Sequence, residues 1–226
     1  MLLNRKSVEL LAPAGTWDAL VAGVESGADA VYLGGKHFNM RMHEGDFNFD
    51  DEMLKKAINY THEHGVHLYI TLNNLISDEE VPALREYLAY LNEIRPDALL
   101  VQDFAVLELV HEMNLNIPIH TSVMMNTHNE HAIEKLKEYG ITRIVVGREM
   151  TLSELSLFRE RTGIEVEYFM HGDMCMSESG QCIHSGVVFG QSGNRGRCLK
   201  PCRWPYQLID EQSGEVLDSE GPGPYK

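Results

Sequence analysis

The chain has 226 residues, with 19 Lys and Arg against 34 Asp and Glu, so its formal net charge at pH 7 is −15. This length allows one large hydrophobic core, and the acidic surplus disfavours a protein that coats DNA or lies on an anionic membrane. The sequence contains neither an apolar run of about 18 residues nor a signal peptide, so we expect a cytoplasmic protein without a membrane or DNA as partner.

Hydrophobic periodicity predicts strict alternation of strands and helices between residues 8 and 170. Short β-branched apolar runs predict seven strands, at 8–12, 30–33, 67–72, 98–102, 117–121, 143–146 and 165–170. Amphipathic stretches predict six helices between them, at 17–26, 50–64, 79–94, 104–114, 127–139 and 151–162. Alternation with short connections implies parallel strands joined by right-handed crossovers.

Two folds fit this alternation, a closed βα barrel and an open doubly wound sheet. Polar residues, or the conformationally special residues proline and glycine, follow the predicted strands at Pro13, Gly34, Gly35, Asn73, Asn74, Asp103, Ser122, Arg148, Glu149, His171 and Asp173. Such residues would converge on the face where barrel enzymes hold their active sites, which favours a TIM-like (β/α) barrel. Since a full barrel has eight units, we expect an incomplete one: a core at 1–170, a cysteine-rich loop at 171–205, and a truncated continuation at 206–226.

All four cysteines of the chain, Cys175, Cys182, Cys198 and Cys202, fall close together. Without an export signal we expect them to be thiols rather than disulfides. A structural zinc site usually takes cysteine pairs separated by two to four residues, and only the second pair fits that spacing. Iron–sulfur clusters accept looser spacing. The pattern therefore favours an iron–sulfur cluster over zinc, and a loop without metal is the remaining alternative.

The cysteine-rich loop also concentrates basic residues, namely Arg195, Arg197, Lys200 and Arg203. Because arginine binds phosphate and carboxylate through paired donors, these side chains are candidates for binding an anionic substrate. The alternative is that they pair with nearby acids or offset the charge of a cluster. His120 and His171, each at the end of a predicted strand, are candidates for proton transfer, with a structural role as the alternative.

Common motifs of hydrolases and nucleotide-binding proteins are missing from the sequence. Three His-Glu dipeptides occur, but Phe47, Val66 and Leu115 stand where a zinc-protease helix needs its second histidine. The sequence also lacks the nucleophile elbow, the Walker loop and the Rossmann glycine fingerprint. The residues themselves give no support to peptide hydrolysis by a known mechanism.

Several stretches of the sequence resemble a known protein family. They are ELLAPAG at 9–15, DAVYLGG at 29–35, GREMTL at 147–152, and a cysteine block in which Glu167-x-Phe169-x-x-Gly172-x-Met174-Cys175-x4-Gly180-x-Cys182 precedes SGNRGRC at 192–198 and PCR at 201–203. On these motifs the chain is identified as a member of the U32 family, long labelled collagenase-like peptidases. The resemblance covers nearly the whole chain.

This resemblance implies a βα-barrel catalytic domain and a four-iron cluster held by cysteines such as these four. It also implies hydroxylation of bases in tRNA or rRNA, in some relatives with prephenate as the oxygen donor, whereas others hydroxylate a ubiquinone precursor. The peptidase label rests on further members. Asp173 stands where the family usually has a small residue, and His184 where an apolar residue is common.

Our hypothesis is an iron–sulfur enzyme that hydroxylates a nucleobase in structured RNA. A [4Fe-4S] cluster is expected on Cys175, Cys182, Cys198 and Cys202. Phosphate or a small anionic donor is expected on Arg195, Arg197 and Arg203. Catalytic residues at the barrel mouth are expected to be His120, Arg148, Glu149, His171 and Asp173. The alternatives are a peptidase acting on proteins, hydroxylation of a quinone precursor, and a non-catalytic accessory protein.

Overall fold

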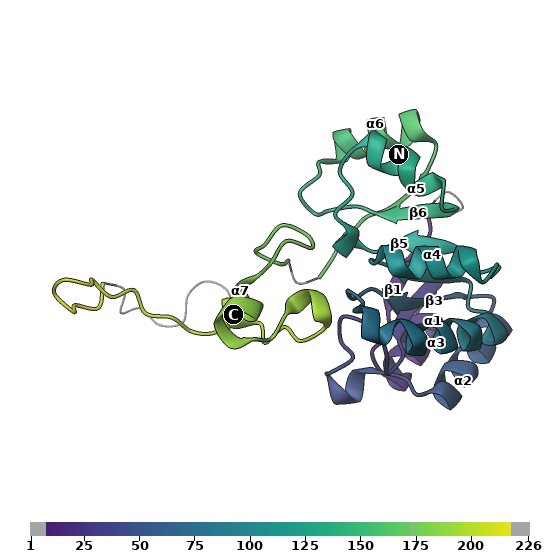
Figure 1. The fold of residues 1–226 in the computed structure, drawn as a ribbon, viewed down its shortest axis with the longest axis horizontal. Coiled ribbons are helices and arrows are strands. Elements are labelled where there is room, and N and C mark those ends of the chain that lie inside the picture. Colours follow the sequence, from purple (N-terminus) through teal and green to yellow (C-terminus); the bar gives the residue numbers. More distant parts are fainter. Residues whose placement is uncertain (1–7, 173, 218–226) are drawn as a thin grey trace.

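The computed structural model describes residues 8–172 and 174–217, and it contains one sheet of seven parallel strands in sequential order (Figure 1). The strands are β1 (Leu11–Pro13), β2 (Ala30–Gly34), β3 (His67–Leu72), β4 (Ala98–Val101), β5 (Ile119–Thr121), β6 (Ile141–Val145) and β7 (Glu165–Glu167). Each strand pairs in parallel with the next along the chain. In the described part of the chain, β1 and β7 have no pairing with each other.

Six helices follow the first six strands, as the periodicity predicts. They are α1 (Trp17–Glu25), α2 (Asp51–Glu63), α3 (Val81–Ile94), α4 (Phe104–Glu112), α5 (Glu130–Lys137) and α6 (Leu152–Thr162). Polar side chains satisfy free backbone N–H groups at their first turns, for example Thr16 before α1 and Asp50 before α2. A short helix that the periodicity does not predict, α7 (His184–Phe189), lies in the cysteine-rich region.

The predicted TIM-like βα architecture is confirmed, and within residues 8–172 and 174–217 the sheet is open between its first and last strands, a gap that we call the open seam. On the outer face of the sheet, residues such as Leu68, Leu99 and Ile144 pack with the helices into the main core. On the inner face a smaller apolar cluster includes Tyr69 and Leu100. Both faces of the strands are therefore buried, as is usual for parallel sheets.

The first and last strands are shorter than predicted. β7 ends at Glu167 because β6 offers partners only along Arg143–Val145, and residues 168–170 beyond it are exposed. β1 likewise has only the three partners Ala30–Tyr32. A strand at the edge of a sheet extends only as far as it forms backbone hydrogen bonds with its single neighbour, and the apolar pattern by itself cannot reveal that length.

After β7 the chain leaves the barrel and runs outward, and we call its described residues 174–217 the cysteine segment (Figure 1). It contains α7 and short 3₁₀ turns at Gly193–Arg195 and Pro201–Arg203. Asp173 and residues 218–226 lie outside the described residues. Across the described part, no helix is long and apolar enough to cross a membrane.

Candidate active site at the barrel mouth

Polar side chains at the carboxyl ends of the strands meet, as the barrel prediction requires. Asn73, after β3, donates from Nδ2 to Ser122 Oγ after β5 at 3.3 Å. Its Oδ1 accepts a hydrogen bond from the backbone N–H of Met40, in the loop after β2, at 3.1 Å. Asp103 has a different role, because it accepts from the N–H groups of Ile76 and Ala105 and so caps α4. The mouth is thus a connected polar surface built from β2, β3 and β5.

Arg148 and Glu149, after β6, contact the cysteine segment. Glu149 Oε1 accepts hydrogen bonds from the Ser179 backbone N–H at 2.7 Å and from its hydroxyl at 3.2 Å. Arg148 donates from Nη2 to the Ser177 carbonyl and to Ser179 Oγ, both at 3.4 Å. Burial acts to raise the pKa of Glu149, but the bonds from Ser179 and the charge of Arg148 outweigh it and the pKa is lowered. Both residues therefore hold the segment against the mouth.

A second set of contacts holds the segment beside β3. Arg195 donates from its two terminal nitrogens to both carboxylate oxygens of Glu80, at 2.8 and 2.9 Å. It also donates to the Leu75 carbonyl, while the Asn194 carbonyl accepts from the Leu75 N–H. Arg195 therefore pairs with a carboxylate of the chain itself, which is the alternative to binding an anionic substrate that the sequence left open.

Two glycines allow the segment to approach the barrel closely. Gly180 has φ +72 and packs against the Met124 carbonyl, and Gly196 has φ +71 and packs against the Asn39 carbonyl. A Cβ atom on Gly196 would lie 2.7 Å from that oxygen. Any larger residue would have to push the segment away, since both the space and the backbone conformation favour glycine.

The four cysteines lie on this docked segment as free thiols. Cys175 and Cys198 are exposed, and Cys182 and Cys202 are partly buried. Arg203 donates to the Met174 carbonyl at 3.1 Å, which ties the neighbour of Cys202 to the neighbour of Cys175. Within residues 8–172 and 174–217, no three His, Cys, Asp or Glu side chains are placed together to hold a metal ion. The donor set, four thiols, has the chemistry of an iron–sulfur or zinc site.

The two candidate histidines lie in different environments. His120, on β5, is 5% exposed and packs edge-on against the Tyr69 ring at 4.8 Å between centroids. Burial, helped by the positive charge of Arg143, lowers the pKa of His120 to about 4, so the ring is neutral at pH 7. Its Nδ1 is buried and has no partner among the described residues. His171 is an exposed residue after β7.

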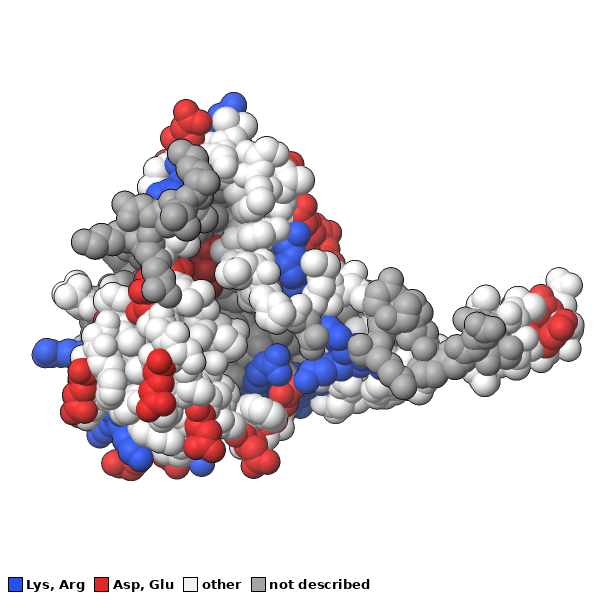
Figure 2. Space-filling view, turned by 180° about the vertical axis from the view of Figure 1, so that it is seen from behind, with Lys and Arg blue, Asp and Glu red and all other residues white. Residues whose placement is uncertain are grey.

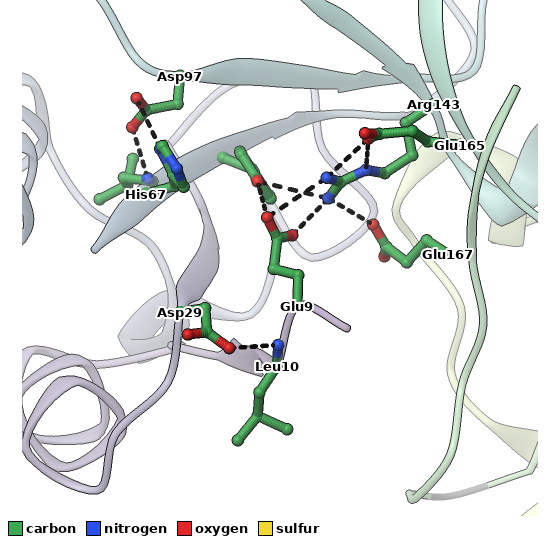
Figure 3. A network of polar contacts seen from close by, with 10 residues as sticks. Glu9, Leu10, Asp29, His67, Asp97, Arg143, Glu165 and Glu167 are labelled. Atoms are coloured by element: carbon green, nitrogen blue, oxygen red, sulfur yellow. Dashed lines mark hydrogen bonds and ion pairs between the residues drawn. The ribbon is translucent and has the colours of Figure 1, made fainter. Parts of the chain in front are cut away.

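A charge cluster inside the barrel was missed by sequence reasoning (Figure 3). Arg143, on β6, pairs with Glu9 before β1 and with Glu165 on β7, where the distance is 3.0 Å. The Tyr69 hydroxyl donates to Glu9 at 2.9 Å, and Glu167 lies 3.9 Å from Arg143. A signal that could have revealed this cluster is the presence of charged residues at inward-facing positions of predicted strands. A charge that faces the interior needs a partner of opposite charge.

The pKa values of Glu167 and Glu9 in this cluster shift in opposite directions, although burial acts to raise both. Burial raises the pKa of Glu167 to about 7, because the charge of Arg143 offsets only part of the loss of solvent. Burial also acts to raise the pKa of Glu9, but the hydrogen bond and charge of Arg143 prevail and lower it. One Glu167 oxygen is buried without a hydrogen-bond partner in the described part of the chain. Glu167 is thus the cluster's proton-holding group near neutral pH.

Comparison with known proteins shows the family of the chain. The model of Peptidase family U32 matches residues 15–224. This chain belongs to the U32 family. A solved U32 peptidase structure shares the fold with a TM-score of 0.60 at 16% identity, covering 71% of this chain and 68% of that one. The predicted family is therefore confirmed.

The named relatives of this chain carry different functions. A Bacillus subtilis tRNA hydroxylation protein is 32% identical over 97% of this chain and 52% of its own length. An Escherichia coli 23S rRNA 5-hydroxycytidine synthase is 34% identical over 97% of this chain and 33% of its own length. A Porphyromonas gingivalis collagenase is 29% identical over 96% of this chain and 54% of its own. The chain thus spans about half or less of these relatives.

Proposed function

We propose that this U32 protein hydroxylates a nucleobase in structured RNA, with tRNA or rRNA as substrate. The observation that carries the proposal is the similarity to a tRNA hydroxylation protein and an rRNA hydroxycytidine synthase along 97% of this chain. That similarity takes in both the barrel mouth and the cysteine segment docked on it. Chemistry at the carboxyl end of a βα barrel is the general rule for this architecture.

Cys175, Cys182, Cys198 and Cys202 are the ligands that we propose for an iron–sulfur cluster, [4Fe-4S] rather than zinc. Four free thiols on one segment supply the donor set such a cluster takes, and the first cysteine pair is spaced too widely for an ordinary zinc site. When bound, the cluster would supply the electron-transfer chemistry that a hydroxylation requires. The contacts of Arg148, Glu149 and Arg195 support a role in positioning the segment.

At the mouth we propose His120, His171 and Asp173 as the groups that meet the substrate. His120 would hold or accept a proton at Nδ1, since that atom is without a described partner and the ring is neutral at pH 7. His171 and Asp173 would act from the stretch that joins β7 to Cys175. The RNA backbone would meet the basic residues of the segment, Arg197 and Arg203, so RNA binding should weaken steeply with added salt.

Nucleoside mass spectrometry of tRNA and rRNA tests the proposed function. RNA from cells that lack the gene is compared with RNA from cells expressing wild type, Cys175→Ser, Cys182→Ser or the control Ser177→Ala, which removes a hydroxyl but no thiol. We expect a hydroxylated nucleoside that disappears in the deletion strain and in both cysteine variants but persists in the control. An unchanged nucleoside profile in the deletion strain would contradict the proposal.

Anaerobic purification tests the cofactor separately. About four irons and four acid-labile sulfides per chain are expected for wild type, with loss in the cysteine variants. Zinc, or no metal after reconstitution, would contradict the cluster. The peptidase alternative draws support from the collagenase relative, and release of peptides from gelatin by pure wild-type protein, unaffected by the cysteine variants, would favour it.

A further inference from the structure

A pocket separates the loop after β2 from the cysteine segment. Its volume is about 500 Å³. It is lined by His43, Glu44, Gln191, Gly196, Arg197, Cys198 and Leu199. This volume is within the usual range for small-ligand sites, and one of the proposed cluster ligands forms part of the wall.

Specific contacts hold the two walls of the pocket in place. Lys200 Nζ pairs with Glu44 Oε1 at 2.9 Å across the gap between the segment and the loop. On the same side, Gly196 packs on the Asn39 carbonyl more closely than any residue with a Cβ atom could. Arg195 anchors the turn that precedes Gly196 through its paired bonds to Glu80. The pocket is therefore bounded by a docked turn rather than by two loosely adjacent loops.

The charge around the pocket is positive, although the chain as a whole carries −15. Among the described residues that line the pocket, Glu44 is the one carboxylate, and it pairs with Arg41 at 3.0 Å and with Lys200. Burial acts to raise the pKa of Glu44, but these cations outweigh it and the pKa is lowered. Arg197 in the lining is a third cation near this carboxylate, in addition to the two that pair with it. Figure 2 shows Lys and Arg side chains gathered where the projecting segment joins the body of the molecule.

Arg197 differs from the other arginine in this turn. Its Nε donates to His43 Nε2 at 3.2 Å, and its terminal nitrogens have no partner among the described residues. Arg195, two residues earlier, uses the same nitrogens to hold Glu80. A guanidinium with two parallel N–H donors available is the group that proteins use to bind carboxylate or phosphate bidentately. The pocket thus has a positive surplus and an unused oxyanion-binding group.

We propose that this pocket binds an oxyanion group through the terminal nitrogens of Arg197, beside His43 and the Cys198 thiol. Two sources present that chemistry, a carboxylate on a small co-substrate and a phosphate of the RNA backbone. The inference deepens the proposed function, because it gives the site of a second reactant or of an RNA contact next to the cysteine segment. Binding of the anion itself does not depend on hydroxylation, so the two can fail independently.

Titration of the full chain with malonate and with inorganic phosphate, at constant ionic strength, tests the pocket. The ring signal of His43, assigned from His43→Gln, reports binding by NMR. Arg197→Gln should weaken binding about tenfold or more, as expected for loss of a hydrogen bond between charged groups. Arg197→Lys should weaken it less, because it keeps the charge but loses the paired donors. Arg159→Gln removes the same charge from the exposed face of α6 and should leave the affinity unchanged.

Two results would contradict oxyanion binding at this pocket. They are the absence of saturable binding in wild type, and equal weakening of binding by Arg197→Gln and Arg159→Gln. A competition arm identifies the source of the oxyanion. Displacement of a short single-stranded RNA by malonate assigns the site to the RNA backbone, whereas simultaneous binding of both assigns it to a small co-substrate. If malonate binds as expected but no hydroxylated nucleoside depends on the gene, the pocket stands and the proposed function fails.

Discussion

The barrel buries its large apolar side chains, whereas the cysteine segment leaves several of them exposed. In the barrel, Leu20 and Leu88 are 0% exposed, whereas in the segment Ile183 is 70% and Val187 73% exposed. The barrel is held by burial on both faces of its sheet. The segment is held by the ion pairs Arg195–Glu80 and Lys200–Glu44, by serine contacts and by two close-packed glycines. Burial couples the barrel into one cooperative unit, while a few polar contacts let the segment be altered without unfolding it.

Removing a buried leucine is the strongest way to test this contrast. Leu88→Ala in α3 should cost about 3 kcal/mol of unfolding free energy, because it leaves a cavity in the core. The same change at Leu199, which is 45% exposed in the segment, should cost less than about 0.5 kcal/mol. Urea unfolding of the two variants checks the difference. Similar losses would mean that the segment folds as part of the barrel core.

Glu167 is the last residue of β7, before the chain enters the cysteine segment, and its contribution to the free energy of unfolding should depend on pH. Its pKa is raised from an ordinary value of 4.5 to about 7, so stability is lost as pH rises through that window and the buried group ionises. Glu167→Gln should therefore stabilise the protein by up to about 3 kcal/mol at pH 8 and by much less at pH 5. Glu165→Gln is the control, because that side chain is 67% exposed. Parallel stability–pH curves for wild type and Glu167→Gln would refute the assignment.

Loosening the segment should have the smallest effect on global stability. Glu80→Gln weakens the paired bonds to Arg195, a partly exposed contact that contributes about 1 kcal/mol or less to stability. We expect trypsin to cleave after Arg197 severalfold faster, with almost no change in the urea midpoint of the barrel. Glu79→Gln, at the exposed neighbouring position, should change neither measurement. A large shift in the urea midpoint for Glu80→Gln would show that this contact supports the barrel itself.

Most of the barrel could be predicted from the sequence because its signals are local. The six helices and seven strands follow from apolar periodicity, and Gly163 ends α6 in the left-handed conformation that favours glycine. The cysteine segment gave no such signal. Its apolar residues are exposed and its contacts join positions far apart, as Arg195 and Glu80 do, so periodicity missed α7.

The sequence could indicate which residues are candidates for the site, but not which of them contact one another. Arg148, Glu149 and His120 were identified from their places at strand ends. That position alone cannot distinguish residues that bind the cysteine segment, as Arg148 and Glu149 do, from a buried residue such as His120. Arg143 was missed because its role depends on Glu9, which reaches it across the open seam of the sheet.

The sequence by itself determined the family, the alternating βα architecture and the presence of all four cysteines on one segment, because motifs, periodicity and spacing are properties of neighbouring residues. Only the tertiary structure decided which charges meet. It paired Arg195 with Glu80, placed Arg197 in the lining of a pocket, and buried Glu167 beside Arg143. Those outcomes depend on desolvation and on distances between segments far apart in the chain, and both arise only when the barrel folds.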